Sequence, residues 1–397
     1  MQLNLFDDHS WDNLLPLTFT RPVSGLRVGI LTIAEKWEKA VGMPPSNLTR
    51  EYLRKKFPCL AGEDNLMINS SLLPDTAVVE AILNLKKEKA LVKEGTLLAV
   101  RIGSFKPDQF LVDQWLGNGS EYQGEVSLVD FPWQIFSLNG QEIEADFEQI
   151  TRGRTSEKLS DTMRVIQSER VFAEPGFTGE YATLNASNGP IYLGPGSEIW
   201  EGSNIRGPFA LCEGSIVKLA AKIYGPTTVG PFSKVGGEIN NAVIQAYSNK
   251  THDGFLGNSV IGEWCNLGAD TNNSNLKNNY GEVKIWNYAR KGYIKTGRQY
   301  CGLIMGDHSK CAINTMFNTG TVVGVSANIF GSGFPNNFIP SFSWGGNGGY
   351  ATYRMDKVLE TANRVMEHRE QKLSEEDVAI LEHIYDYSED LRKVTGV

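Results

Sequence analysis

The most constraining feature of this sequence is a large apolar residue that recurs at every sixth position between residues 193 and 329. The uninterrupted run consists of Leu193, Ile199, Ile205, Leu211, Val217, Ile223, Val229 and Val235. The pattern returns at Phe255, Ile261 and Leu267, and again at Met305, Cys311, Phe317, Val323 and Ile329. Helices repeat about every 3.6 residues and strands every two, so neither produces this period. A period of six is typical of a parallel β-helix, in which each hexad forms one short strand and a turn, and three hexads complete a coil.

A second register of mostly small residues supports the same fold. Four residues after successive apolar positions come Ser197, Ser203, Phe209, Ser215, Ala221, Thr227 and Ser233, and later Ser309, Thr315, Thr321 and Ala327. We expect both registers to face into the prism, with the small side chains at its corners. A larger side chain there would collide with the next coil.

Length and charge narrow the class of protein. With 397 residues, the chain is long enough for two or three domains. Its net charge of −8 and the absence of a long basic tract argue against nucleic-acid and membrane partners. No apolar run reaches the roughly 18 residues of a membrane span. Five cysteines without C-x-x-C spacing, and no signal-peptide pattern, predict reduced thiols and a cytoplasmic protein.

The chain is predicted to have four parts. Residues 1–136 form an α/β domain, 137–188 a connector, 189–330 the β-helix domain, and 331–397 a Gly/Pro-rich loop followed by helices. In the first part we expect strands at Gln2–Phe6, Leu66–Asn69 and Thr96–Ile102, and helices near Ile33–Val41, Leu48–Phe57 and Val78–Leu91. This alternation favours a mostly parallel sheet.

The stretch after the first predicted strand carries a motif. It consists of Leu15, Pro16, Leu17, Thr18, Arg21 and Pro22, and it resembles the opening of sugar-phosphate nucleotidyltransferases. Those enzymes precede it with a Gly-rich phosphate-binding turn, which residues 7–11 replace here. In place of that turn, Arg21, Arg27 and Lys36 are the candidates for binding nucleotide phosphates, and Asp7, Asp8 or Asp75 are available for Mg²⁺. The alternative is solvated surface charge and a simple turn.

The hexad register slips between Val235 and Phe255, because twenty residues are not a multiple of six. We therefore expect a loop to leave the prism there, carrying Lys250, His252 and Asp253. Breaks in a solenoid are frequent functional sites.

A second motif surrounds this break. Its members are Gly236, Glu238, Asn241, His252, Phe255, Gly257, Ile261, Gly262, Asn266, Gly268, Ala269, Thr271 and Asn275. Their spacing resembles the bifunctional UDP-N-acetylglucosamine pyrophosphorylase/glucosamine-1-phosphate N-acetyltransferase family. The resemblance implies a left-handed β-helix, a homotrimer, acetyl-CoA and Mg²⁺ as cofactors, and a hexosamine 1-phosphate and UTP or another NTP as substrates. Asn240 stands where that family has a phosphate-binding lysine.

The resemblance also assigns roles. N-acetylation needs a base for the amine of glucosamine 1-phosphate, and histidine titrates near neutral pH, so His252 is the candidate. Glu238, Asn266 and Asn275 complete the predicted catalytic set. The predicted substrate-binding residues are Lys250, Phe255, Lys277, Tyr280 and Lys284, and coenzyme A is expected beside Ala269 and Ala312.

Three other interpretations remain open at this point. The chain could be a non-catalytic trimeric scaffold that binds sugar nucleotides, or an acyltransferase for another amino-sugar phosphate with an inactive N-terminal domain. A zinc hydratase on the same fold needs three histidines, and the solenoid sequence contains only His252 and His308. His308 is expected to be structural. Amphipathic spacing from Met355 to Met366 and a capping box at Ser374 and Asp377 predict two C-terminal helices.

Overall fold

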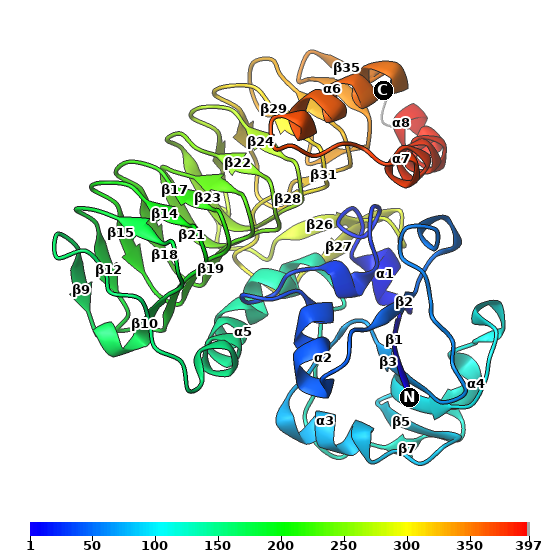
Figure 1. Cartoon of the computed structure of the whole chain (residues 1–397). Helices are drawn as coiled ribbons and strands as arrows, with labels where there is room; N and C mark the ends of the chain where they lie inside the picture. The colour runs from blue at the N-terminus through cyan, green and yellow to red at the C-terminus, as the bar shows by residue number, and fades with distance from the viewer. Residues whose placement is uncertain (395–397) are drawn as a thin grey trace. The chain divides into compact units, whose positions relative to one another are not determined.

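The six-residue repeat builds a parallel solenoid in the computed structural model, which describes residues 1–394 (Figure 1). Ile199 pairs with Val217 and Val217 with Val235, so one coil takes eighteen residues. The repeated apolar side chains form one buried cluster along the axis, as the hexads predict. The predicted fold class, an α/β domain followed by a left-handed β-helix and C-terminal helices, is confirmed.

The solenoid has three faces. The first face contains β10 (Val171–Ala173), β13 (Ile191–Leu193), β16 (Phe209–Leu211), β19 (Thr227–Val229), β28 (Ile304–Met305), β31 (Val322–Val323) and β33 (Phe338–Ile339). The second contains β11 (Thr178–Gly179), β14 (Glu198–Ile199), β17 (Ile216–Val217), β20 (Lys234–Val235), β22 (Asn249–Lys250), β24 (Asn266–Leu267), β29 (Lys310–Cys311), β32 (Asn328–Ile329) and β34 (Ser343–Gly346), with β35 (Gly349–Thr352) at its end. The third contains β9 (Arg164–Ile166), β12 (Thr183–Asn185), β15 (Asn204–Arg206), β18 (Lys222–Tyr224), β25 (Asn272–Asn273) and β30 (Met316–Phe317). Strands β21 (Glu238–Ile244) and β23 (Phe255–Ile261) run through both the third and the first face.

The register slip after Val235 comes from short coils, and the predicted loop at that position was wrong. Val235 pairs with Lys250, only fifteen residues on, and Ile244 pairs with Ile261, seventeen residues on. These coils contain fewer residues because β21 and β23 continue straight through a corner at which other coils turn. The coil stays closed, so Lys250 occupies an inward position.

The segment that does leave the prism lies one coil later. Ile261 pairs with Met305, forty-four residues on, which is more than two ordinary coils. The additional residues form an antiparallel hairpin of β26 (Lys284–Asn287) and β27 (Gly292–Lys295), closed at its base by a bridge between Leu276 and Tyr300. Asn272 and Asn273 accept hydrogen bonds from the backbone N–H groups of Phe255 and Gly257. These two asparagines therefore extend the ladder beside the hairpin.

The solenoid is longer than the sequence predicts at both ends. Its strands begin at Arg164, inside the predicted connector, and end at Gly346, beyond residue 330. The start of the predicted connector is part of the helix α5 (Pro132–Thr151). Its buried side chains include Trp133, Phe136 and Ile143, which stand at helical spacing.

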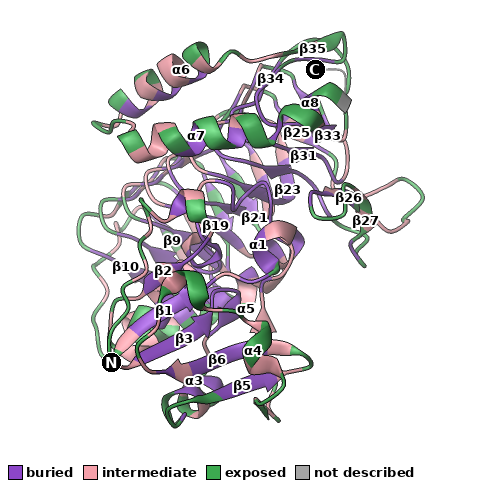
Figure 2. Cartoon of the chain, turned by 90° about the vertical axis from the view of Figure 1, so that its right-hand side faces the viewer, coloured by how far each residue is buried: buried purple, intermediate pink, exposed green. Residues whose placement is uncertain are grey.

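The C-terminal helices follow the sequence prediction. Helix α6 (Met355–Glu367) buries Val358, Ala362 and Met366. Helix α7 (Glu375–Tyr387) starts with the predicted capping box, since the Ser374 side chain accepts from the Asp377 backbone N–H. A break at Ser388 separates it from α8 (Glu389–Val394), so the last predicted helix is two helices. Figure 2 shows α7 with buried residues along one side.

The N-terminal unit is built around a six-stranded mixed sheet, with strand order β2-β1-β3-β6-β5-β7. Its strands are β1 (Gln2–Phe6), β2 (Ser46–Leu48), β3 (Asn65–Asn69), β5 (Lys89–Lys93), β6 (Thr96–Ile102) and β7 (Ser120–Glu121), beside a small ladder of β4 (Leu72–Leu73) and β8 (Ser127–Leu128). Its helices are α1 (Ser10–Asn13), α2 (Ile33–Val41), α3 (Thr76–Leu83) and α4 (Asp113–Leu116). Three of the five neighbouring pairs are parallel and two antiparallel, in agreement with a mostly parallel sheet.

Two helix predictions in this unit were wrong. The predicted helix at Leu48–Phe57 is the end of β2 followed by a short 3-10 turn, and the one at Val78–Leu91 ends at Leu83 before β5 begins. Helix α2 has the predicted bounds because a capping box starts it, with Thr32 and Glu35 exchanging hydrogen bonds, and Gly42 ends it in the left-handed conformation. Two short segments, Leu15–Phe19 and Arg27–Ile30, belong to the solenoid unit.

The closest backbone approach between coils gives a stability prediction. A Cβ on Gly230 would lie 1.5 Å from the carbonyl oxygen of Gln245 in the next coil. We expect Gly230→Ala to lower the free energy of unfolding by about 3 kcal/mol or more, because backbone of two stacked coils has to separate. Urea unfolding measures this. Gly348→Ala is the control, since nothing lies within 4 Å of that Cβ position, and equal stabilities of the two variants would contradict the stacking.

Among residues 1–394, none of the helices combines the length and hydropathy that a bilayer-spanning segment requires.

Candidate acyl-transfer groove and N-terminal polar site

A groove of about 950 Å³ runs along one corner of the solenoid. Its lining residues come from successive coils: Trp200, Lys218, Leu219, Lys234, Gly237, Thr251, His252, Asp253, Ala269 and Asp270. Of the predicted site residues, His252 and Ala269 share this groove. The volume lies at the upper end of the range of roughly 300–1,000 Å³ that is usual for small-molecule sites.

His252 is exposed and lies on a tight corner between β22 and β23. The corner fits closely against its neighbours, because a Cβ on Gly237 would lie 2.8 Å from the His252 carbonyl oxygen. The backbone N–H of Asp270 donates to the Asp253 carbonyl at 3.0 Å, which ties the corner to the following coil. The imidazole is therefore presented to the groove from a fixed backbone.

Lys250 holds this corner from inside the prism. Its ammonium donates to the carbonyl oxygens of Gly236, His252 and Asp253 at 3.2, 2.5 and 3.3 Å. The side chain is only 3% exposed, and burial lowers the pKa of Lys250 to about 8. Lys250 was predicted to bind substrate, and the structure places it inward, because the short coil pairs it with the inward Val235.

The other predicted catalytic residues do not line the groove. Glu238 accepts a hydrogen bond from the Tyr224 hydroxyl at 2.7 Å and pairs with Lys222 at 3.6 Å, and the bond raises the pKa of Tyr224 to about 12. Asn266 is exposed on the second face. Asn275 donates to the Asn258 side chain at 2.8 Å, next to the half-buried Phe255.

The remaining predicted lysines line a different cavity. Lys277 and Lys284 border a space of about 750 Å³ beside the β26–β27 hairpin, together with Trp286 and Tyr293. The Lys277 ammonium donates to the Glu282 carbonyl at 2.7 Å. Tyr280 is 64% exposed on the preceding turn. These three residues are therefore carried by the inserted hairpin region, away from the groove lining.

The predicted coenzyme A contacts fall on neighbouring coils. Ala269 lines the groove, and the half-buried Ala312 belongs to the following coil. A Cβ on Gly268 would lie 2.5 Å from the Ala312 carbonyl carbon, so the backbones of these coils are stacked closely. His308 stacks on Trp264 with ring centroids 6.3 Å apart, which fits the expected structural role.

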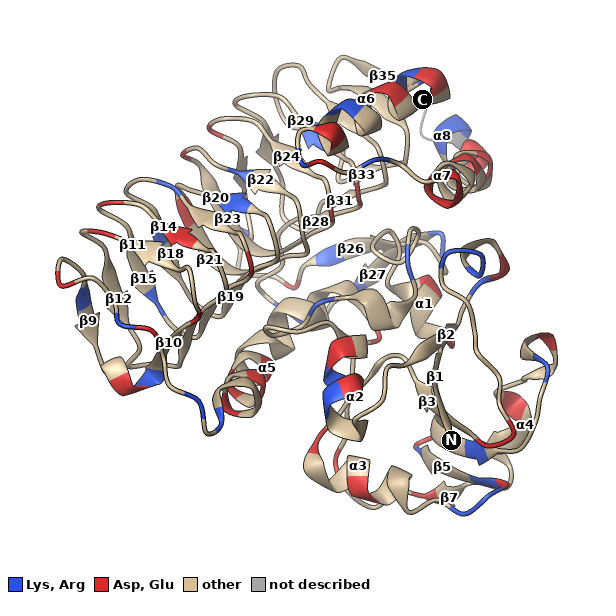
Figure 3. Cartoon of the chain, viewed as in Figure 1, with Lys and Arg blue, Asp and Glu red and all other residues tan. Residues whose placement is uncertain are grey.

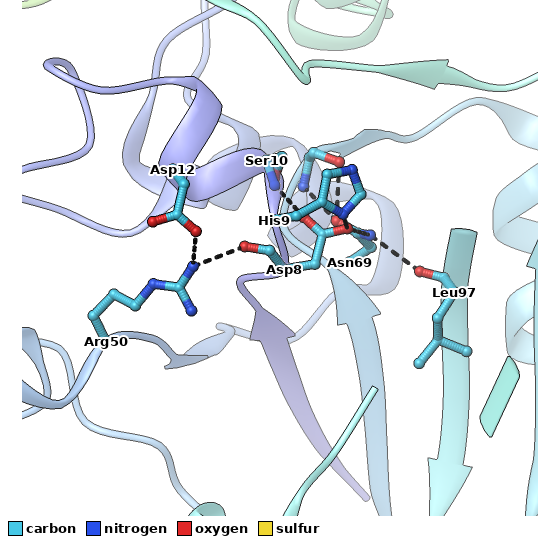
Figure 4. Close-up of polar contacts among 8 residues, drawn as sticks. Asp8, His9, Ser10, Asp12, Arg50, Asn69 and Leu97 are labelled. Atoms are coloured by element: carbon cyan, nitrogen blue, oxygen red, sulfur yellow. Dashed lines mark hydrogen bonds and ion pairs between the residues drawn. The ribbon is translucent and has the colours of Figure 1, made fainter. Parts of the chain in front are cut away.

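A polar cluster lies at the carboxyl end of β1 in the N-terminal unit (Figure 4). Asp8 accepts hydrogen bonds from the Ser10 backbone N–H at 2.8 Å and from the Asn69 amide at 2.9 Å, and His9 lies 3.4 Å from it. Arg50 donates to the Asp8 carbonyl at 3.1 Å and pairs with Asp12 at 2.7 Å. The Asn69 amide also donates to Leu97 of β6, which joins the cluster to the sheet.

The carboxylates here differ in their fitness for a metal ion. Asp7 accepts hydrogen bonds from the Thr49 hydroxyl at 2.5 Å and the Val23 N–H at 3.1 Å, and burial raises its pKa to about 6, which disfavours the ionised form that would bind a metal ion. Burial and then the charge of Asp8 raise the pKa of Asp130. Mg²⁺ is commonly held by one or two carboxylates together with water and phosphate oxygens, and residues 1–394 contain no group of three or more His, Cys, Asp and Glu side chains placed to hold a metal ion by themselves.

The predicted nucleotide-binding cations are buried. Arg21 in the N-terminal unit is 7% exposed, and Lys36 on α2 is 2% exposed. Arg27 belongs to the solenoid unit, where its backbone N–H donates to the Gln245 side chain at 2.7 Å and its guanidinium donates to the Ile30 carbonyl. The sequence motif therefore does not place these three charges on one open phosphate site.

Sequence reasoning missed the cations of the groove. Lys218 follows the inward Val217, and Lys234 precedes the inward Val235. The hexad register alone therefore predicts that both lysines point outward. What the register does not show is that both border the cavity of His252. Asp130 was missed because no motif marks it.

Parts of the chain are similar to known proteins. Residues 3–155 match the family model described as sugar nucleotidyl transferase. A bifunctional sugar-1-phosphate nucleotidylyltransferase/acetyltransferase of Sulfurisphaera tokodaii is 33% identical over 100 residues, which is 25% of this chain and 24% of that protein. The bifunctional protein GlmU of Methanococcus aeolicus is 30% identical over 127 residues, 32% of this chain and 28% of that protein. Part of the chain is therefore similar to sugar nucleotidyl transferases and to proteins of this bifunctional kind. It matches about a quarter of the length of these two relatives.

Among solved structures, a UDP-N-acetylglucosamine acyltransferase of Francisella novicida covers 59% of this chain and 88% of its own. It is 9% identical, with a TM-score of 0.34, and at that level it adds nothing about substrates.

Proposed function

We propose that the solenoid transfers an acetyl group from acetyl-CoA to the amine of a hexosamine 1-phosphate, with glucosamine 1-phosphate as the preferred acceptor. The observation that carries this proposal is the position of His252, which borders the groove on a corner that a buried lysine fixes. The spacing of the motif around His252, and the similarity to bifunctional nucleotidylyltransferase/acetyltransferases, support the same reaction.

The chemistry requires one proton acceptor and a fixed geometry. The His252 imidazole accepts the proton that the amine loses as its nitrogen attacks the thioester carbonyl. The new N–C bond forms while the C–S bond breaks, and coenzyme A leaves as the thiol. Backbone contacts hold the corner that carries His252, so the base is attached to an ordered backbone.

Acetylation assays test this proposal. Purified protein is incubated with acetyl-CoA and either glucosamine 1-phosphate or galactosamine 1-phosphate, and the sugar is followed by mass spectrometry. We expect the mass of one acetyl group to be added faster to the glucosamine compound. Acetylation of neither compound by folded protein would count against the proposal and favour a binding scaffold.

For the N-terminal unit we propose uridylyl transfer from UTP to N-acetylglucosamine 1-phosphate. A Mg²⁺ ion held by Asp8 and Asp130 would neutralise phosphate charge there. We expect Mg²⁺-dependent release of pyrophosphate, and its loss in Asp130→Asn. Asp12→Asn is the control, since Asp12 pairs with Arg50 on the exposed side of the cluster. If no NTP yields pyrophosphate, the unit is a binding module.

A further inference from the structure

Two lysines border the His252 groove without a role in the proton transfer just described. Lys218 and Lys234 line the same cavity as His252, and within residues 1–394 neither forms an ion pair with a carboxylate. The groove lining also contains Asp253 and Asp270, so Lys218 and Lys234 are the groups in it that supply positive charge for binding an anion. Phosphorylated sugars supply such an anion.

The Lys218 side chain rests on an aromatic ring. Its ammonium lies 3.3 Å from the centroid of the Trp200 ring, and the Trp200 N–H donates to Glu198 at 2.8 Å. The pKa of Lys218 is lowered by burial and then by the charge of Lys234, while Glu198 acts in the opposite direction. Both lysines line the same groove from neighbouring coils, so an anion bound between them would be attracted by both charges.

The lysines lie at a suitable distance from His252. Strands β17, β20 and β22 are stacked in register, so Lys234 lies one coil and Lys218 two coils before the corner that carries His252. Neighbouring coils are about 4.8 Å apart. A Cβ on Gly236 would lie 3.2 Å from the Cβ of Lys218 and 2.2 Å from the Thr251 carbonyl oxygen. The base of Lys218 and the His252 corner thus meet at one glycine.

We propose that Lys218 and Lys234 bind the phosphate of the amino-sugar acceptor, and that Trp200 holds Lys218 in position beforehand. The inference rests on the proposed acetyl transfer. In a hexosamine 1-phosphate the amine and the phosphate are on neighbouring carbons, so an amine at His252 places the phosphate within one to two coils of it. The pair replaces the phosphate-binding lysine whose place Asn240 takes.

Other lysines near the motif are less suited to this role. Lys250 is buried against three carbonyl oxygens, and Lys277 and Lys284 line the second cavity. Lys222 on β18 pairs with Glu238 at 3.6 Å and is absent from the groove lining. Lys222 is therefore a matched control, because it lies between Lys218 and Lys234 in the sequence but on the neighbouring face of the solenoid.

The test combines direct binding with kinetics for Lys218→Met, Lys234→Met, the double variant and Lys222→Met. Glucosamine 1-phosphate and inorganic phosphate are titrated by calorimetry. We expect each single variant to weaken binding of the sugar phosphate at least about tenfold, and the double variant at least about 100-fold. The KM for acetyl-CoA stays the same, and Lys222→Met changes sugar-phosphate binding by less than about threefold.

The outcomes separate this inference from the proposed function. Unchanged binding in the Lys218 and Lys234 variants of an active enzyme, or a large loss in Lys222→Met alone, overturns the phosphate site and leaves acetyl transfer standing. Phosphate binding that depends on both lysines, in protein without acetylation activity, supports the anion site and counts against the reaction. A wild-type protein that binds neither probe overturns the inference.

Discussion

Replacing His252 by Ala is expected to lower the kcat of N-acetylation by at least about 10²-fold, because general bases contribute roughly 10²–10⁴ to rates of this kind. His252 is exposed at a corner of the solenoid, so thermal unfolding should not change. Steady-state release of thiol at saturating sugar phosphate measures the effect.

His308→Ala is the matched control for this variant. His308 lies in the same solenoid but stacks on Trp264 at another corner. The kcat of His308→Ala should stay within about threefold of the wild type, since the groove of His252 is lined by other residues. A His252→Ala enzyme with wild-type kcat would remove histidine base catalysis from the account.

Replacing Lys250 by Met is expected to give the second-largest effect. Met fills the inward position, but the carbonyl oxygens of Gly236, His252 and Asp253 lose their shared donor. We expect kcat to fall about 10- to 100-fold, because small displacements of a catalytic group have effects of this size. Leu267→Met is the control, as Leu267 fills an inward position of the following coil. Equal kcat values in the two variants would show that Lys250 does not position His252.

The same variant changes the pH dependence of stability. The folded chain releases the Lys250 proton at a pKa of about 8, whereas the unfolded chain keeps it until about 10.5. Between these values the unfolded state binds more protons, so the stability of the wild type should rise with pH relative to Lys250→Met. Urea unfolding at several pH values measures this difference, and parallel curves for the two proteins would contradict a buried, titrating ammonium.

The sequence predicted the solenoid well because each inward position makes the same packing demand. The spacing from Leu193 to Val235 fixes both the coil length and the inward face, and the structure has both. The predictions failed where a coil deviates. The spacing of the apolar residues shows that the hexad register shifts, but not whether residues are missing or added. A coil shortened to fifteen residues at Lys250 therefore could not be distinguished from an inserted loop.

The candidate site was predicted only in part, because the sequence shows local motifs but not which side chains share a cavity. His252 follows from a local motif, and the structure places it at the groove. Glu238 and Asn275 have the motif spacing, yet they face Tyr224 and Asn258. Which outward side chains share a cavity depends on the stacking of coils that are far apart in sequence, and no local pattern reports it.

The most direct measurement is the release of coenzyme A thiol from acetyl-CoA when glucosamine 1-phosphate is added, with wild type and His252→Ala assayed side by side. The account predicts thiol release that requires the sugar phosphate and disappears in the variant. Thiol release that is equal in both proteins, or absent from folded wild-type protein, would contradict an acyl-transfer site at His252.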